Sequence, residues 1–154
     1  MLIEKHLATL GITLPAPTMP VAAYVPYVIT GNLVFISGQL PVENGAVKYT
    51  GHVGDEVSPE DGKLAARLCA LNILAHLQKA CGGDLDRVER CVKLAGFVSS
   101  APNFFDQPQV MNGASELMEQ VFGEAGKHAR IALGTRNLPR NATVEVDAIF
   151  ALKA

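Results

Sequence analysis

Residues 128–150 carry the pattern that most restricts how this chain can fold. Two runs that alternate apolar and polar side chains flank a turn-prone segment at residues 137–141, which predicts a β-hairpin. With the turn centred between Asn137 and Leu138, Arg130 lies opposite Glu145. The alternation also assigns two faces to the strands. Side chains expected toward a helix layer are Ile131, Leu133, Val144 and Val146, and those expected on the other face are Arg130, Thr143, Glu145 and Asp147.

The rest of the chain predicts a mixed sheet with two long helices, within a single domain over residues 1–154. Residues 1–20 are expected to form a short helix and a Pro-rich connector. Strands at 25–30 and 33–37 flank the turn Gly31-Asn32, and a second turn follows at Asn44-Gly45. Ser58 begins a helix that runs to about Cys81. A strand at 88–99 and a helix at 108–121 precede the closing strands. We therefore expect an α+β fold with both helices on one face of the sheet.

The other face of this sheet is expected to be partly apolar, with Ala95, Phe97, Ala132 and Ile149 on it. Apolar sheet faces of this kind are commonly covered by another subunit. The chain is therefore expected to form an oligomer, and Arg130 and Glu145 are expected near a subunit interface. Crevices of this type favour small-molecule sites.

Composition excludes several classes of function. The net charge of −2 provides no general attraction to nucleic acid or to an anionic membrane. The 3 cysteines lack CxxC spacing, and the 4 histidines lack paired metal spacing. Neither a P-loop nor a GxGxxG motif occurs. No apolar run has transmembrane length. We expect a cytoplasmic protein without a metal site, a cofactor or a membrane partner.

Two separated motifs resemble those of the reactive intermediate deaminase family, RidA/YjgF, also called L-PSP endoribonuclease-like. The N-terminal motif is Tyr24, then Gly31-Asn32 and an apolar run, then Ser37-Gly38-Gln39-Leu40-Pro41. The C-terminal motif is Ala129-Arg130, Leu138-Pro139 and Val144-Glu145-Val146. The resemblance extends from about residue 20 to the C-terminus, and both motifs occur in the family's order.

The resemblance implies a chorismate-mutase-like fold and a homotrimer whose three sheets form a central barrel with clefts between subunits. It implies hydrolysis of 2-imino acids and their enamine tautomers to 2-keto acids and ammonia. Arg130 would bind the substrate carboxylate with help from the Gly38 backbone N–H, and Glu145 would position the attacking water. Tyr24, Ser37 and Asn112 would line the pocket, with Tyr24 and Glu145 facing Arg130 of the neighbouring subunit.

The chain departs from the family pattern at three places. Ala132 stands where many members have Cys, which excludes thiol chemistry there. Lys127-His128 replaces a common Phe-Pro before Ala129-Arg130, and one extra residue separates Asn112 from Arg130. The N-terminal half is also longer than in common members, which indicates a subgroup with its own substrate.

Other interpretations stay open from the sequence. Arg130 and Glu145 could form only a cross-strand ion pair, worth roughly 0.2–1 kcal/mol when exposed. Tyr24 could pack against a turn, and Asn112 could face solvent. Two further functions compete with the deaminase. One is a non-catalytic binder of small carboxylate metabolites, and the other is an endoribonuclease or translation inhibitor acting on RNA. The acidic net charge and the lack of Trp disfavour the RNA function.

Overall fold

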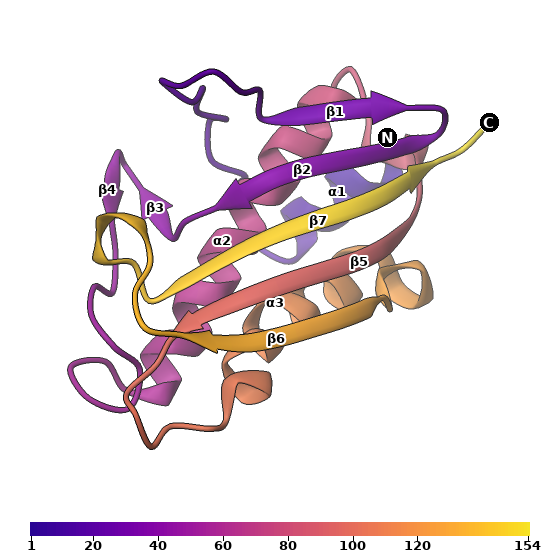
Figure 1. Cartoon of the computed structure of the whole chain (residues 1–154). Coiled ribbons are helices and arrows are strands. Elements are labelled where there is room, and N and C mark those ends of the chain that lie inside the picture. The colour runs from indigo at the N-terminus through magenta and orange to yellow at the C-terminus, as the bar shows by residue number, and fades with distance from the viewer.

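A five-stranded mixed sheet forms one layer of the protein, and helices cover only one of its faces (Figure 1). This description comes from a computed structural model of residues 1–154. Only β5 and β6 run parallel, and the other neighbouring strands are antiparallel. The expected α+β class is therefore confirmed. Across the sheet the order is β1 (Tyr27–Thr30), β2 (Leu33–Gln39), β7 (Val144–Leu152), β5 (Val88–Ser99) and β6 (Ala129–Thr135).

Both tight turns lie where the sequence predicts them. Gly31 has φ 58° in the turn that joins β1 to β2. Asn44 and Gly45 have φ 52° and 81° between β3 (Val42–Glu43) and β4 (Ala46–Val47), a small separate ribbon. Consecutive left-handed residues match the twist of two-residue hairpins, and Asn-Gly adopts this conformation at low cost.

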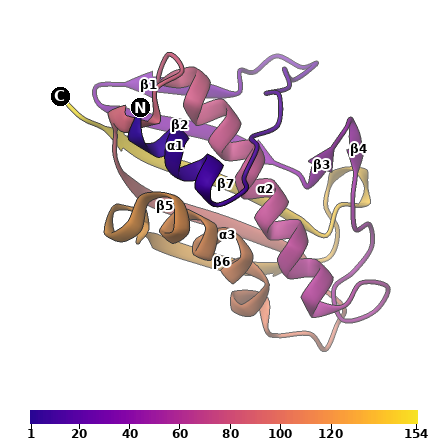
Figure 2. The same ribbon diagram turned by 180° about the vertical axis from the view of Figure 1, so that it is seen from behind.

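Two long helices, α2 (Pro59–Ala80) and α3 (Gln107–Phe122), make up most of the helical layer (Figure 2). The Ser58 hydroxyl accepts a hydrogen bond from the Asp61 N–H at 3.1 Å, so the expected cap of α2 is confirmed. The helices approach closely because Gly113 has no side chain. A Cβ built there would lie 2.0 Å from the Lys63 carbonyl oxygen. The largest fully buried side chains lie between helices and sheet and include Ile73, Leu74, Leu77, Leu94, Met111, Leu117, Met118 and Phe150.

The predicted C-terminal hairpin is wrong, because β5 lies between β6 and β7 (Figure 1). Arg130 pairs with Leu94 on β5, and Glu145 pairs with Phe97 on the same strand. The connection includes the short 3-10 helix η3 (Pro139–Asn141). It has enough residues to cross the end of β5, so adjacency in sequence does not produce pairing here.

Strand β6 also presents the opposite faces from those expected. Leu94 and Gly96 of β5 are buried beneath the helices, and their partners Arg130 and Ala132 share that face. The expectation that Ala132 lies on the uncovered face is therefore wrong as well. Ile131 and Leu133 lie on the uncovered face, with 43% and 45% of their surface exposed.

Strand β7 follows the predicted alternation. Val144 and Val146 are fully buried toward the helices, and Glu145 and Asp147 lie on the uncovered face. Thr143 precedes the strand and is fully buried, so it adds nothing to the exposed surface of the uncovered face. We call this uncovered side the open face. Its apolar residues are Val28, Phe35, Phe97, Ile131, Leu133 and Ile149.

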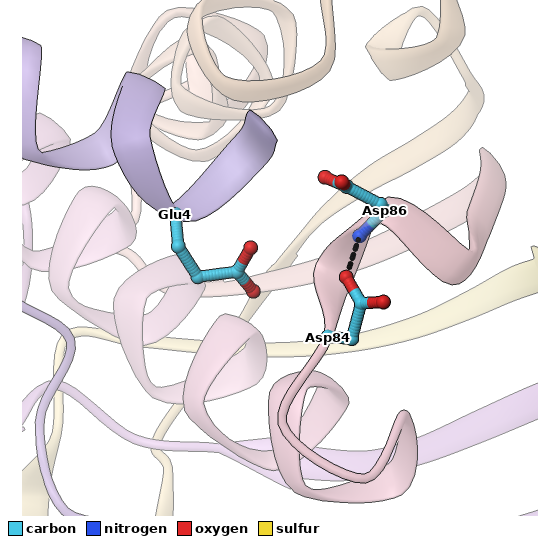
Figure 3. A group of neighbouring side chains, drawn as sticks. All are labelled: Glu4, Asp84 and Asp86. Carbon is cyan, nitrogen blue, oxygen red and sulfur yellow. Dashed lines mark hydrogen bonds between the residues drawn. The ribbon is translucent and has the colours of Figure 1, made fainter. Parts of the chain in front are cut away.

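The N-terminal helix α1 (Leu2–Thr9) is held by carboxylates that cap helix ends. Asp86 accepts hydrogen bonds from the backbone N–H groups of Leu2 and Ile3 at 2.7 and 2.8 Å. In return, Glu4 accepts from the Leu85 N–H at 2.7 Å, at the start of the 3-10 helix η1 (Leu85–Arg87). Figure 3 shows Glu4, Asp84 and Asp86 converging, with Asp84 accepting from the Asp86 N–H. The two backbone N–H groups lower the pKa of Asp86 to about 2. The capping of backbone N–H groups therefore explains why these three carboxylates lie close together.

None of the helices combines the length and the apolar character needed to cross a bilayer.

Candidate functional site

Four of the expected site residues line one cavity of about 420 Å³ beside the ends of β2 and β7. They are Tyr24, Ser37, Gly38 and Glu145. The Ser37 hydroxyl donates to the Val25 carbonyl at 2.7 Å, which ties the segment that carries Tyr24 to strand β2. Tyr24 itself is more than half exposed, so its hydroxyl is free to meet a ligand or another chain.

Gly38 and Glu145 are in direct contact. The β2–β7 register shifts between Ile36 and Gln39, and Gly38 lies within this irregular stretch. A Cβ at Gly38 would lie 2.9 Å from the Glu145 Oε1 atom. The missing side chain is therefore what lets the carboxylate lie against the backbone of β2.

The surroundings of Glu145 raise the pKa of its carboxyl group. Partial burial raises the pKa of Glu145, and the neighbouring charge of Asp147 raises it further. Burial also raises the pKa of Asp147, although Lys93 opposes that change. A carboxylate whose pKa is raised toward neutrality is a better proton acceptor in general base catalysis than an ordinary one.

Arg130 and Asn112 lie in a different cavity, of about 360 Å³, between α3 and β6. The Arg130 Nη1 donates to the Asn112 Oδ1 at 2.8 Å and to the Ser115 Oγ at 3.2 Å. No carboxylate lies within ion-pair distance of the guanidinium. Asn112 contacts Arg130 directly, so the alternative that its side chain only faces solvent is excluded.

Within one chain the structure does not bring Arg130 and Glu145 together. Arg130 lies on the helix-covered face of β6, whereas Glu145 lies on the open face of β7, and β5 separates the two strands. The simple cross-strand ion pair is therefore excluded. The six expected residues form two groups: Tyr24, Ser37, Gly38 and Glu145 in one, and Asn112 and Arg130 in the other.

Sequence reasoning gave no role to three residues in these cavities. Ser115 contacts Arg130 directly, and His128 contacts Ser115 at 2.9 Å. Arg140 lines the cavity that contains Glu145. His128 was notable in the sequence only for its place beside the arginine motif. Nothing in the spacing of Ser115 pointed to Arg130, because their proximity depends on how α3 packs against β6.

The chain belongs to the YjgF/chorismate mutase-like family, the RidA/YjgF family, whose description also mentions an endoribonuclease. The family model matches residues 4–152. Protein TCP17 of Trypanosoma cruzi is 47% identical over 151 residues, 97% of this chain and 94% of that protein. The crystal structure of Atu1372 from Agrobacterium tumefaciens, a protein of unknown function, is 50% identical, with a TM-score of 0.92. The match covers 98% of this chain and 92% of that one.

A more distant relative has a named activity. The 2-iminobutanoate/2-iminopropanoate deaminase of the mite Dermatophagoides farinae is 28% identical over 143 residues, 92% of this chain and 95% of that protein. The family thus includes imine deaminases, whereas the names of the relatives at 47% and 50% identity state no reaction.

Proposed function

We propose that this protein is a 2-imino acid and enamine deaminase, which hydrolyses reactive imines to 2-keto acids and ammonia. We further propose that it acts as a homotrimer, with each site assembled at a cleft between two subunits. The observation that carries the proposal is the division of the six site residues between two cavities. One cavity offers an unpaired guanidinium, and the other offers a partly buried carboxylate with a raised pKa.

The two groups suit the two ends of a 2-imino acid. A guanidinium binds a carboxylate through two parallel hydrogen bonds, which fixes the position of the adjacent imine carbon. In this proposal Arg130 makes those bonds, and the Gly38 N–H adds a third. Tyr24, Ser37 and Asn112 line the remaining wall. The deaminase among the relatives acts on imines of this class, as its name states.

The reaction needs a positioned water and a proton acceptor. A water oxygen adds to the imine carbon while Glu145 takes one of the water protons. Glu145 then returns its proton to the carbinolamine nitrogen. The C–N bond breaks and ammonia leaves, while Glu145 accepts the hydroxyl proton as the hydroxyl group becomes the keto group. That proton finally passes to the ammonia, which departs as ammonium. A protonated imine is already electrophilic, so these residues need supply only orientation and acid–base catalysis. One well-placed acid–base group contributes on the order of 10²–10⁴-fold in rate.

The open face supports assembly through two copies. Ile131 and Leu133 on β6 and Val28 on β1 leave an apolar surface without cover in the single chain. Burying such a surface against a second copy is favourable. In the proposed trimer this contact brings Arg130 of one chain beside Glu145 of the next.

Imine hydrolysis provides the direct test. Imines are generated in situ from several amino acids by an oxidase, and their loss is followed by trapping with semicarbazide. Wild type should accelerate the loss of at least one imine, and Arg130→Ala should abolish the acceleration. Glu145→Ala should lower the rate by about 10²-fold or more. Arg67→Ala is the matched control, since Arg67 lies on α2 and contacts Gln120.

Mixed oligomers test the composite site. Arg130→Ala and Glu145→Ala chains are co-expressed with different tags and purified through both. Every cyclic trimer that carries both tags has one of its three clefts with both groups intact, so about one third of wild-type activity should return. Inactive mixed oligomers would contradict a site shared between chains.

The remaining functions are also separated by these assays. Carboxylate binding without imine hydrolysis would favour a non-catalytic binder. RNA cleavage that survives Arg130→Ala and weakens steeply with salt would favour a nucleic-acid function.

A further inference from the structure

Both hydrogens on one nitrogen of Arg130 are already engaged by the protein. The Nη1 atom carries two N–H bonds, and Asn112 Oδ1 and Ser115 Oγ accept from it. The three remaining N–H groups of the guanidinium lie on its Nε and Nη2 atoms. Those two atoms form one edge with the spacing that a carboxylate accepts in bidentate fashion. The orientation of this edge therefore depends on how firmly Nη1 is held.

Ser115 is itself held by His128. The His128 Nδ1 atom lies 2.6 Å from the Gly126 carbonyl oxygen, which can only accept, so Nδ1 carries the hydrogen. In the neutral ring, Nε2 is then an acceptor, and it lies 2.9 Å from Ser115 Oγ. The Ser115 hydroxyl therefore donates to His128 and turns a lone pair toward Arg130. The result is an ordered chain of hydrogen bonds from Arg130 through Ser115 and His128 to Gly126.

We propose that Ser115 and His128 are positioning residues that hold the Arg130 guanidinium so that its Nε–Nη2 edge meets the ligand carboxylate. This inference rests on the proposed function, because it takes Arg130 as the carboxylate-binding residue. It assigns a purpose to His128, which lies two residues before Arg130, and to Ser115 on the facing helix.

The neutral state of His128 is part of the arrangement. A protonated ring would donate from Nε2 and would compete with Arg130 for the lone pairs of Ser115. Burial lowers the pKa of His128 and the charge of Arg130 lowers it further, although the Gly126 carbonyl opposes this change. Four charged side chains line the same cavity: Glu116 and Glu119 on α3, Lys127 just before β6, and Arg130 on β6. Arg90 lies next to this segment, where its Nη2 donates to the Lys127 carbonyl.

Binding of 2-oxobutanoate, measured by calorimetry, tests the proposal with four variants. Ser115→Ala removes the hydroxyl, and Ser115→Thr retains one. His128→Leu removes the acceptor, whereas His128→Gln retains an amide oxygen that can accept from Ser115 but cannot titrate. We expect Ser115→Ala and His128→Leu to raise the Kd about tenfold. Ser115→Thr and His128→Gln should stay within about threefold of wild type.

The pH profile separates positioning from a general structural effect. As the pH falls below about 6.5, protonation of His128 should raise the Kd of wild type, and His128→Gln should remove that dependence. Because Glu145 also titrates with a raised pKa, the series is repeated in Glu145→Gln. An affinity that instead rises in acid, or a Kd for Ser115→Ala equal to wild type, would overturn the proposal.

A measurement without ligand tests the positioning role of Ser115 and His128 independently of the proposed deaminase function. If wild type binds no 2-oxobutanoate and hydrolyses no imine, the function fails, yet the hydrogen-bond chain remains testable by ¹⁵N NMR. The His128 ring should report the Nδ1–H tautomer at neutral pH, and the Arg130 guanidinium signals should shift in Ser115→Ala. An Nε2–H tautomer, or unchanged Arg130 signals, would overturn the positioning role.

Discussion

Replacing Gly38 by alanine should impair catalysis while leaving the fold intact. The new Cβ would lie 2.9 Å from Glu145 Oε1, 3.2 Å from its Cδ and 3.3 Å from its Cγ. An unstrained carbon–oxygen contact needs about 3.3 Å, so the carboxylate must retreat by about 0.4 Å. A displacement of about 1 Å at a reacting group costs about 10²-fold in rate, so about tenfold is expected here.

Stability should change little in Gly38→Ala for two reasons. The obstructing atoms belong to the flexible end of a side chain, which can move at small cost. The φ of Gly38 lies outside the left-handed region, so alanine adopts it without strain. Alanine also restricts the unfolded chain, which stabilises by about 0.4–1 kcal/mol and offsets part of the contact cost. The melting temperature should therefore stay within about 4 °C of wild type.

A double-mutant cycle tests whether Gly38 acts through Glu145. The semicarbazide assay gives kcat/KM for wild type, Gly38→Ala, Glu145→Ala and the double variant. If the methyl group acts by displacing the carboxylate, Gly38→Ala should have no further effect in the Glu145→Ala background. An equal tenfold loss in both backgrounds would refute the reasoning, as would a large fall in melting temperature.

Three further predictions concern stability. Gly113→Ala should lower the free energy of unfolding by about 3 kcal/mol, measured in urea, because its Cβ would meet the rigid Lys63 carbonyl oxygen at 2.0 Å. Gly62→Ala, also in a helix, meets only side-chain atoms at 3.1 Å or more and should cost far less. Glu145→Gln should raise the melting temperature at about pH 8. Because the pKa of Glu145 is raised in the folded state, the ionised carboxylate destabilises the fold at a pH above that pKa. The difference in melting temperature between Glu145→Gln and wild type should therefore shrink as the pH falls through the pKa of Glu145. Asp86→Asn should lower the melting temperature at neutral pH and speed amide exchange in α1. This difference should be present above pH 3.8 and lost as the pH falls toward about 2, where Asp86 itself protonates.

Local signals in the sequence predicted most of the elements. Asn44-Gly45 and the Ser58 cap encode their conformations within a few residues, so their positions could be read directly. The strand over residues 88–99 also agrees with β5 (Val88–Ser99). These features depend on short-range chemistry, which a single sequence contains.

The errors arose from long-range pairing. Nothing near residues 137–141 encodes that β5 inserts between β6 and β7, because strand order is decided by how α3 returns the chain to the sheet. The alternation on β6 defined two faces correctly but could not say which one the helices cover. Ile131 and Leu133 are apolar and still lie on the open face, so apolar character alone did not identify the face that the helices cover.

The same limit explains why the site was only half predictable. The motif around Gly38 and Glu145 led to residues that do share a cavity, because β2 and β7 are neighbours. Arg130 was expected opposite Glu145 on a shared face. This prediction depended on the C-terminal hairpin and was wrong for the same reason. Ser115 was invisible in the sequence because its contact with Arg130 is created by tertiary packing.

The position of β7 bears on how the protein matures during synthesis. This strand follows all the others in the chain, yet it sits in the middle of the sheet, between β2 and β5. Before β7 emerges from the ribosome, the β1–β2 hairpin and the β5–α3–β6 unit have no strand to join them. Each exposes an unpaired edge that is prone to aggregation. The sheet of the nascent chain therefore stays in two halves until β7 has been translated, and chaperones that shield strand edges would matter most for this protein in that interval.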